Sequence, residues 1–191
     1  MNASQQATIL IVPGLRDHVE DHWQTHLERQ LSAVRKVVCV QPLEIEKLSC
    51  AARVAAIQRT IEAIEGPVVV VAHSGGVVML MHWAQQHDTS AIQSALLVAP
   101  PDFETPLPAG YPTLDALQAN GWLPVPRRAL PFRSVVAAST NDPLARLDRV
   151  MQMAREWGSE LVNVGALGHI NPASGFGEWP MAEQLLQSLE P

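Results

Sequence analysis

The chain has 191 residues, of which 47% are hydrophobic and 17% are charged, and its formal net charge is -6 at pH 7. This length predicts one domain, residues 1–191, that buries roughly 70% of the surface its unfolded form would expose. The acidic balance comes without a basic stripe, so we expect neither nucleic acid nor an anionic membrane as a partner. No apolar run approaches the ~20 residues of a membrane span, and no basic stretch opens a secretory leader, so we expect a cytoplasmic protein.

Short runs of β-branched residues alternate with segments of helical periodicity. Between the predicted strands, apolar residues recur every three or four positions, as in a helix with one buried face. The strands are apolar throughout, which favours a sheet covered on both faces. The alternation predicts an α/β fold around a mostly parallel six-stranded sheet with helices on both faces. The predicted strands are residues 8–12, 36–40, 67–71, 95–99, 134–138 and 160–164, and the helical patterns cover residues 23–34, 54–64, 144–154 and 181–189.

Residues 100–131 interrupt this alternation with a proline-rich segment. They contain eight prolines and are too long for an ordinary connection. We expect an excursion over the active-site end or the edge of the sheet, with a short helix within residues 113–120. The two cysteines, Cys39 and Cys50, fall in apolar patterns and are expected to be buried small hydrophobic residues.

The stretch VVVVAHSGGVVM, residues 68–79, places Ser74 between an apolar strand and an apolar helix. In open α/β sheets, sites form at the carboxyl ends of the strands. A nucleophile elbow holds its serine in a strained turn there, and the residues two positions before and after must be small. Ala72 and Gly76 meet this requirement, in the pattern A-x-S-x-G. The pentapeptide alone is equally typical of a tight turn whose serine caps the helix.

A serine hydroxyl is a weak nucleophile and needs a base, which in turn needs a carboxylate to orient it. Asp142 follows the strand at residues 134–138, and His169 follows the strand at residues 160–164. The chain order Ser, Asp, His is that of α/β hydrolases. We therefore predict Ser74 as the nucleophile, His169 as the base and Asp142 as the orienting carboxylate.

Other residues could fill some of these roles. Asp102, directly after the strand at residues 95–99, could supply the carboxylate in place of Asp142. His73 adjoins Ser74, but we expect it to support the turn rather than act as the base. His82 and His87 follow on the next helix and are expected to be packing or surface residues.

An oxyanion hole needs two backbone N–H groups aimed at the developing negative charge. One is expected from Gly75, after the nucleophile, and the other from Leu15 in the loop after the first strand, where Gly14 allows a close approach. A partly open aromatic cleft would suit small apolar acyl groups, although its aromatic residues could equally be packing residues. The predicted walls are Leu15, His18, Trp23, Tyr111, Trp122, Phe176 and Trp179.

Four blocks occur in the order VPGLRDHVEDHWQTHLE, VAHSGG, ASTNDPL and GHINPASGFGEWP. Together they resemble the small serine hydrolases related to retinoblastoma-binding protein 9, and the resemblance covers nearly the whole chain. It implies a compact α/β-hydrolase fold with no large lid domain, a triad at Ser74, Asp142 and His169, and action on small esters or peptide-like acyl compounds. The family often has Gly where this chain has Ala72.

These observations predict a serine hydrolase that forms an acyl-enzyme and needs no cofactor. A metal-dependent hydrolase stays open, because His18, His22 and His26 are spaced by four, although such steps drift about 40° around a helix. A non-catalytic interaction protein on the same scaffold also stays open. Besides a small acyl substrate, an exposed sheet edge is compatible with a second copy of the chain in a homodimer.

Overall fold

The computed structural model describes residues 6–17, 19–43 and 45–189, and six strands in this part form one sheet. The strands are β1 (Thr8–Val12), β2 (Val37–Cys39), β3 (Val68–His73), β4 (Ile92–Val98), β5 (Arg133–Ser139) and β6 (Glu160–Gly165). Their order is β2-β1-β3-β4-β5-β6, and every neighbouring pair is parallel. The predicted parallel six-stranded sheet is confirmed. The carboxyl ends of all six strands therefore meet at one edge of the sheet.

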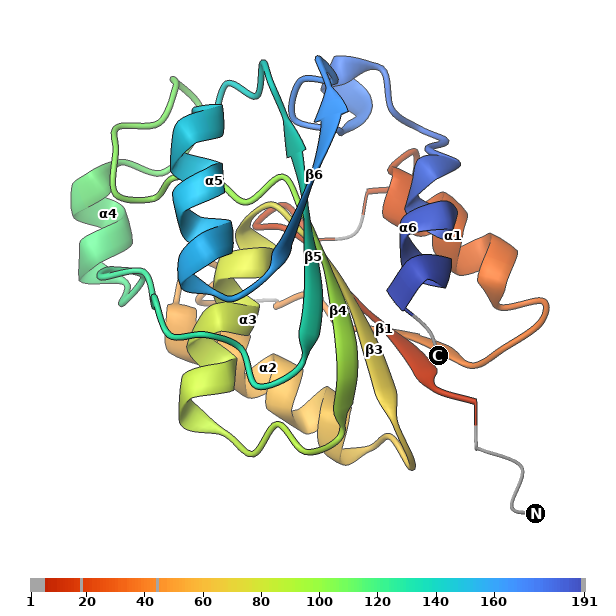
Figure 1. The fold of residues 1–191 in the computed structure, drawn as a ribbon. Coiled ribbons are helices and arrows are strands. Elements are labelled where there is room, and N and C mark those ends of the chain that lie inside the picture. Colours follow the sequence, from red (N-terminus) through yellow and green to blue (C-terminus); the bar gives the residue numbers. More distant parts are fainter. Residues whose placement is uncertain (1–5, 18, 44, 190–191) are drawn as a thin grey trace.

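Helices cover both faces of this sheet (Figure 1). On one face lie α1 (Trp23–Leu31) and α6 (Met181–Leu189), and on the other lie α2 (Cys50–Glu62), α3 (Gly75–Gln86) and α5 (Leu147–Glu156). The central strand β3 is buried along its whole length, and its side chains alternate between two apolar clusters. Val68 and Val70 pack on the α3 side, whereas Val69 and Val71 pack on the α6 side. This is why the strand carries no polar alternation.

Two helix boundaries and one buried helix face differ from the periodicity. The first helix ends at Leu31, and Val34 beyond it is 74% exposed, because the chain turns there toward β2. Leu144 precedes α5 and is buried in the loop. The apolar spacing in the last helix predicts that Met181 belongs to its buried face. The helix instead buries Ala182, Leu186 and Leu189, and Met181 is exposed.

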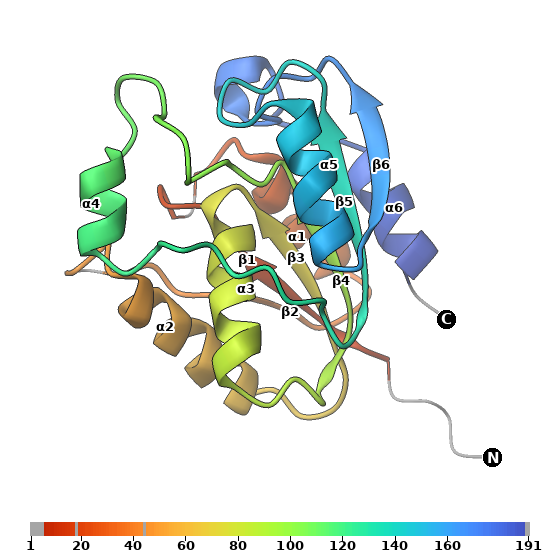
Figure 2. The same cartoon turned by 60° about the vertical axis from the view of Figure 1, so that its left-hand side comes forward.

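The proline-rich segment contains the expected short helix, α4 (Leu114–Ala119), beyond the α2 and α3 side of the sheet (Figure 2). Phe103, Leu117 and Trp122 from this segment belong to the same apolar cluster as α2 and α3. The Cys50 amide also donates to the Asn120 carbonyl at 3.0 Å. Within the described residues, the segment therefore packs on the core and forms no large lid domain.

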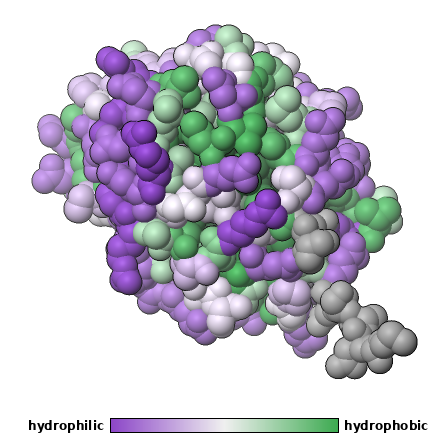
Figure 3. All heavy atoms as spheres, in the orientation of Figure 1, coloured by the Kyte–Doolittle hydropathy of each residue, from purple (hydrophilic) through white to green (hydrophobic). Residues whose placement is uncertain are grey.

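The edge strand β6 lies beside α5, and the two present different surfaces (Figure 3). The outer side of α5 is hydrophilic, whereas apolar side chains gather over β6, where Val162 and Val164 are only partly buried. The predicted homodimer at a sheet edge stays a prediction. None of the helices in the described ranges is both long and apolar enough to span a membrane.

Candidate active site

Ser74 lies in the turn between β3 and α3 with backbone angles of φ 55° and ψ -130°. Such a left-handed conformation is unusual for a residue with a side chain and is maintained by its surroundings. The Ser74 amide donates to the Val98 carbonyl at 2.9 Å. A Cβ atom on Gly76 would lie 2.4 Å from the Val12 carbonyl oxygen and 2.6 Å from that of Pro13. Only glycine fits so close to β1, so the turn has the geometry of a nucleophile elbow.

Ser74, His169 and Asp142 form a continuous hydrogen-bonded chain at the carboxyl edge of the sheet. The Nε2 atom of His169 lies 2.7 Å from the Ser74 Oγ, and its Nδ1 atom lies 2.8 Å from Oδ2 of Asp142. A carboxylate only accepts hydrogen bonds, so Nδ1 carries the proton and Nε2 is left to accept from the serine hydroxyl. The side chains of His169 and Asp142 are 5% and 2% exposed. The structure thus brings together three residues that are far apart in the sequence.

One further hydrogen bond orients the Asp142 carboxylate within its own loop, and another joins this loop to the loop that carries His169. The Leu144 amide donates to Oδ1 of Asp142 at 2.9 Å, which orients the carboxylate. The Gly168 amide donates to Oδ1 of Asn141 at 2.7 Å. These contacts fix the histidine next to its carboxylate before any substrate is bound.

His73 lies behind the site. Its Nε2 atom donates to the His169 carbonyl at 2.9 Å, and its ring centroid is 5.0 Å from that of His169. Burial, and then the neighbouring His169 and His22 rings, lower the pKa of His73 well below its ordinary value. It is therefore a neutral side chain that supports the His169 loop.

The two later histidines of this region lie away from Ser74 on α3. His82 Nε2 lies 3.1 Å from the Trp122 carbonyl oxygen, and the His87 ring stacks near Trp83. Both contacts are packing contacts of α3, as the sequence indicated.

Two backbone amides flank Ser74. Gly75 is the first residue of α3, so its N–H has no partner within the helix. A Cβ atom on Gly75 would lie 3.5 Å from the Leu15 nitrogen, and one on Gly14 would lie 3.6 Å from the Ser74 Oγ. The turn after β1 therefore brings the Leu15 nitrogen close to Gly75, beside the turn that carries Ser74.

A cavity of about 360 Å³ opens above Ser74 and His169. Phe103 and Tyr111 supply its aromatic walls, and Leu15 and Leu144 are among its aliphatic ones. This volume lies at the lower end for small-molecule sites. The cavity is suited to a short acyl group rather than a folded protein segment.

Of the aromatic residues predicted for this cavity, Tyr111 lines it, but four others lie elsewhere. Trp23 is 1% exposed and packs against Trp179 with ring centroids 5.3 Å apart. Trp122 is fully buried, with its indole N–H donating to the Leu48 carbonyl, and Phe176 packs on the α6 side of the core. None of these four side chains lines the cavity, so the prediction that they bind substrate is corrected. Their surfaces pack against other side chains of the protein instead.

His18, the remaining predicted wall residue, lies outside the described residues. Phe103, by contrast, was missed as a wall residue. It follows the carboxyl end of β4, at the same edge of the sheet as Ser74, and this position was the signal that could have identified it.

The spaced histidines of α1 have separate partners. His22 caps the helix, since its Nδ1 atom accepts from the Gln24 amide at 3.1 Å, and His26 Nε2 lies 2.9 Å from Oδ1 of Asp21. Residues 6–17, 19–43 and 45–189 hold no group of three or more His, Cys, Asp or Glu side chains arranged for a metal ion. The third histidine of the pattern, His18, is not among them.

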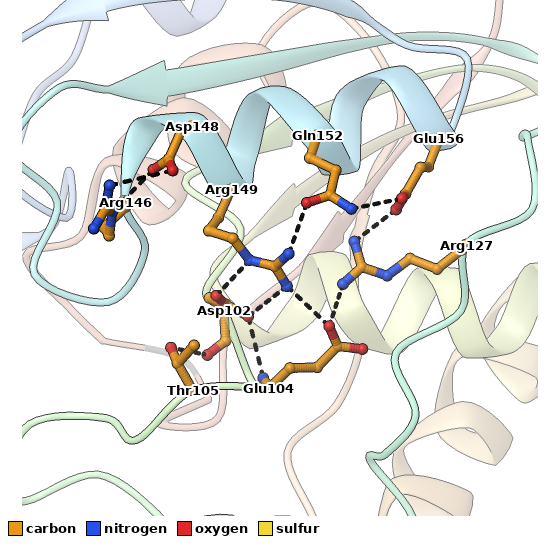
Figure 4. A network of polar contacts seen from close by, with 9 residues as sticks. All are labelled: Asp102, Glu104, Thr105, Arg127, Arg146, Asp148, Arg149, Gln152 and Glu156. Carbon is orange, nitrogen blue, oxygen red and sulfur yellow. Dashed lines mark hydrogen bonds and ion pairs between the residues drawn. The ribbon is translucent and has the colours of Figure 1, made fainter.

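Asp102, the alternative carboxylate, is buried and pairs with Arg149, whereas His169 pairs with Asp142. Arg149 on α5 donates to Asp102 through Nε at 2.9 Å (Figure 4). Arg149 also donates to Glu104, which Arg127 contacts from the proline-rich segment. This network ties the segment after β4 to α5.

Comparison with known proteins decides the family. The sequence model of the family described as Serine hydrolase matches residues 9–188. The chain belongs to this family. It is therefore a hydrolase of the esterase type with a catalytic serine, on the α/β-hydrolase fold, and the resemblance noted in the sequence is confirmed.

Solved structures agree with this assignment. A YdeN-like hydrolase from Pectobacterium atrosepticum is 31% identical, with a TM-score of 0.76, and the match covers 98% of this chain and 95% of that chain. The ydeN gene product of B. subtilis is 17% identical with a TM-score of 0.71, covering 96% and 98%. Alpha/beta hydrolase domain-containing protein 10 from mouse is 12% identical with a TM-score of 0.69, covering 98% and 92%. These last two show the fold alone. No functionally curated protein matches the hydrolase.

Proposed function

We propose that this serine hydrolase cleaves a small ester or an amide-like acyl compound through an acyl-enzyme, with Ser74, His169 and Asp142 as its catalytic triad. One observation carries the proposal: the chain of short hydrogen bonds from Oγ of Ser74 through the His169 ring to the Asp142 carboxylate. A serine held in a left-handed turn at the mouth of a cavity gives this chain access to a substrate.

The reaction proceeds in two acyl transfers. His169 Nε2 removes the hydroxyl proton as Oγ of Ser74 attacks the substrate carbonyl, and the Leu15 and Gly75 amides stabilise the oxyanion. The tetrahedral intermediate then expels the leaving group, which takes the proton from Nε2. A water molecule repeats both steps on the acyl-enzyme, with its proton passing to Nε2 and then back to Oγ. Asp142 keeps the proton on Nδ1 throughout, and no step calls for a cofactor.

The cavity limits the acyl group to a small one. Its volume of about 360 Å³ and its walls from Phe103, Tyr111 and Leu144 suit a short or aromatic apolar chain. We therefore expect esters of short acids to be better substrates than those of long ones.

A fluorophosphonate probe tests the nucleophile directly. We expect it to label the wild-type protein at Ser74 and to leave Ser74→Ala unlabelled. Ser74→Ala and His169→Ala should each lower kcat on a 4-nitrophenyl ester by about 10⁴- to 10⁶-fold. Unchanged turnover in Ser74→Ala would exclude this mechanism. No labelling of the wild type would favour a non-catalytic interaction protein.

A further inference from the structure

Arg53 is a buried cation beside the active site that no step of the reaction uses. It lies on α2 and its side chain is only 5% exposed. Its Nε atom donates to the Lys47 carbonyl at 2.9 Å, its Nη2 atom donates to the Leu15 carbonyl at 3.2 Å, and its Nη1 atom donates to Oδ1 of Asp17. The guanidinium therefore joins two separate segments of chain.

Both segments form the mouth of the cavity. Leu15 and Asp17 line it from the turn after β1, and Lys47 lines it from the segment before α2. The turn closes on itself where the Asp17 amide donates to the Gly14 carbonyl at 3.0 Å. Leu15 thus has its nitrogen close to Gly75, next to Ser74, while its carbonyl accepts a hydrogen bond from Arg53.

The backbone of this turn needs external support. Asp17 has φ 59°, a left-handed conformation that costs free energy in a residue with a side chain. Its side chain is 13% exposed and is held by the Arg53 guanidinium. The ion pair therefore stabilises the conformation that ends the turn.

Stability alone does not call for a charged residue here. Burying a guanidinium is costly, and apolar residues of similar volume often replace buried ion pairs without loss of stability. An apolar side chain cannot donate hydrogen bonds to two carbonyls and a carboxylate. The planar guanidinium of arginine can, because its N–H groups point in fixed directions.

We propose that Arg53 is a positioning residue for the oxyanion hole: it fixes the turn at residues 14–17 so that the Leu15 amide points at the developing negative charge. This inference rests on the proposed function, because it takes Leu15 as an oxyanion donor. Arg53 acts through Leu15 and touches no reacting atom.

Three variants separate the parts of this role. Arg53→Lys keeps a cation next to Asp17 but loses the fork, Arg53→Met removes the charge, and Asp17→Asn keeps an acceptor without the charge. A misplacement of about 1 Å in an active site can cost about 100-fold in rate. We expect kcat to fall about 10- to 100-fold in Arg53→Met and by a smaller factor in Arg53→Lys, with KM changed little. Arg53→Lys also serves if Arg53→Met does not fold.

The matched control is Arg127→Met, which removes another partly buried arginine that pairs with two carboxylates, Glu104 and Glu156. It lies outside the cavity lining, so it should lower the melting temperature without lowering kcat. If Arg53 has a purely structural role, Arg53→Met should likewise lower the melting temperature without lowering kcat.

A trifluoromethyl ketone distinguishes oxyanion stabilisation from other effects, because its adduct with a serine carries an oxyanion in the hole. We expect its inhibition constant to rise across the Arg53 and Asp17 variants by the same factor by which kcat/KM falls. Folded Arg53 variants with wild-type kcat, or with a lowered kcat and an unchanged inhibition constant, would overturn the inference. If Ser74→Ala keeps full activity, the proposed function fails instead, and that result is read independently of Arg53.

Discussion

Arg149 donates through Nε to the carboxylate of Asp102 at 2.9 Å, so this buried acid is paired with α5 rather than with His169. Asp142 makes the contact to His169 Nδ1 instead. The two acids should therefore respond differently to the same change. Asp142→Asn should lower kcat by roughly 10³- to 10⁴-fold with little loss of stability, because the histidine loses the partner that fixes its tautomer.

Asp102→Asn is the matched control. It should leave kcat nearly unchanged but cost about 1–3 kcal/mol of folding free energy, because the Arg149 guanidinium and the Glu104 backbone amide both lose a charged acceptor. In a domain of this size, 1 kcal/mol lowers the melting temperature by about 2–4 °C. Calorimetry and ester kinetics on the two variants check this, and a large loss of kcat in Asp102→Asn alone would reverse the assignment.

Sequence reasoning succeeded where a residue's place on a strand determined its position in the fold. Ser74, Asp142 and His169 each follow a strand, and parallel strands bring their carboxyl ends to one edge, so their meeting was predictable. The cavity walls were not predictable in the same way. Trp23 and Phe103 are both apolar aromatics in the sequence, and only the packing of α1 and of the proline-rich segment decides which one lines the cavity.

Gly76 should be irreplaceable for folding, whereas its neighbour Gly75 should not. A methyl group on Gly76 would meet the carbonyl oxygens of Val12 and Pro13 at 2.4 and 2.6 Å, and these backbone atoms at the end of the inner strand β1 cannot move away. A methyl group on Gly75 would meet the Leu15 side chain at 2.9 Å, and that side chain can rotate. We expect Gly76→Ala to lose about 3 kcal/mol or more, or to be insoluble, and Gly75→Ala to fold.

Chemical denaturation of the two alanine variants measures this difference. Gly75→Ala should nevertheless lose activity, because the new methyl group pushes aside the Leu15 side chain, which lines the cavity next to Ser74. Equal unfolding free energies for Gly76→Ala and the wild type would contradict the packing of α3 against β1.

Both cysteines should be unreactive in the folded hydrolase. Cys50 is buried as expected, whereas Cys39 is only partly buried. Burial is the main cause that raises the pKa of each thiol to about 12, and both thiols are free. Because the thiolate is the reactive form, iodoacetamide at pH 8 should modify neither residue in the native protein and both in urea. Mass spectrometry of the two samples checks this, and rapid native labelling of either cysteine would show that its thiol is not protected.

His73 should make stability fall in mild acid. Burial, and then the His169 and His22 rings, hold its folded-state pKa well below the unfolded value of about 6.5. Below that pH the unfolded chain binds a proton at this position that the folded protein cannot bind, so the unfolding free energy decreases as pH falls. We expect a loss on the order of 1–2 kcal/mol between pH 6.5 and 5, measured by urea titration. In His73→Gln the unfolding free energy should depend less steeply on pH. The dependence that remains includes the contribution of His82, because burial lowers the pKa of His82 as well. An identical slope in His73→Gln and the wild type would mean that His73 does not titrate in this way.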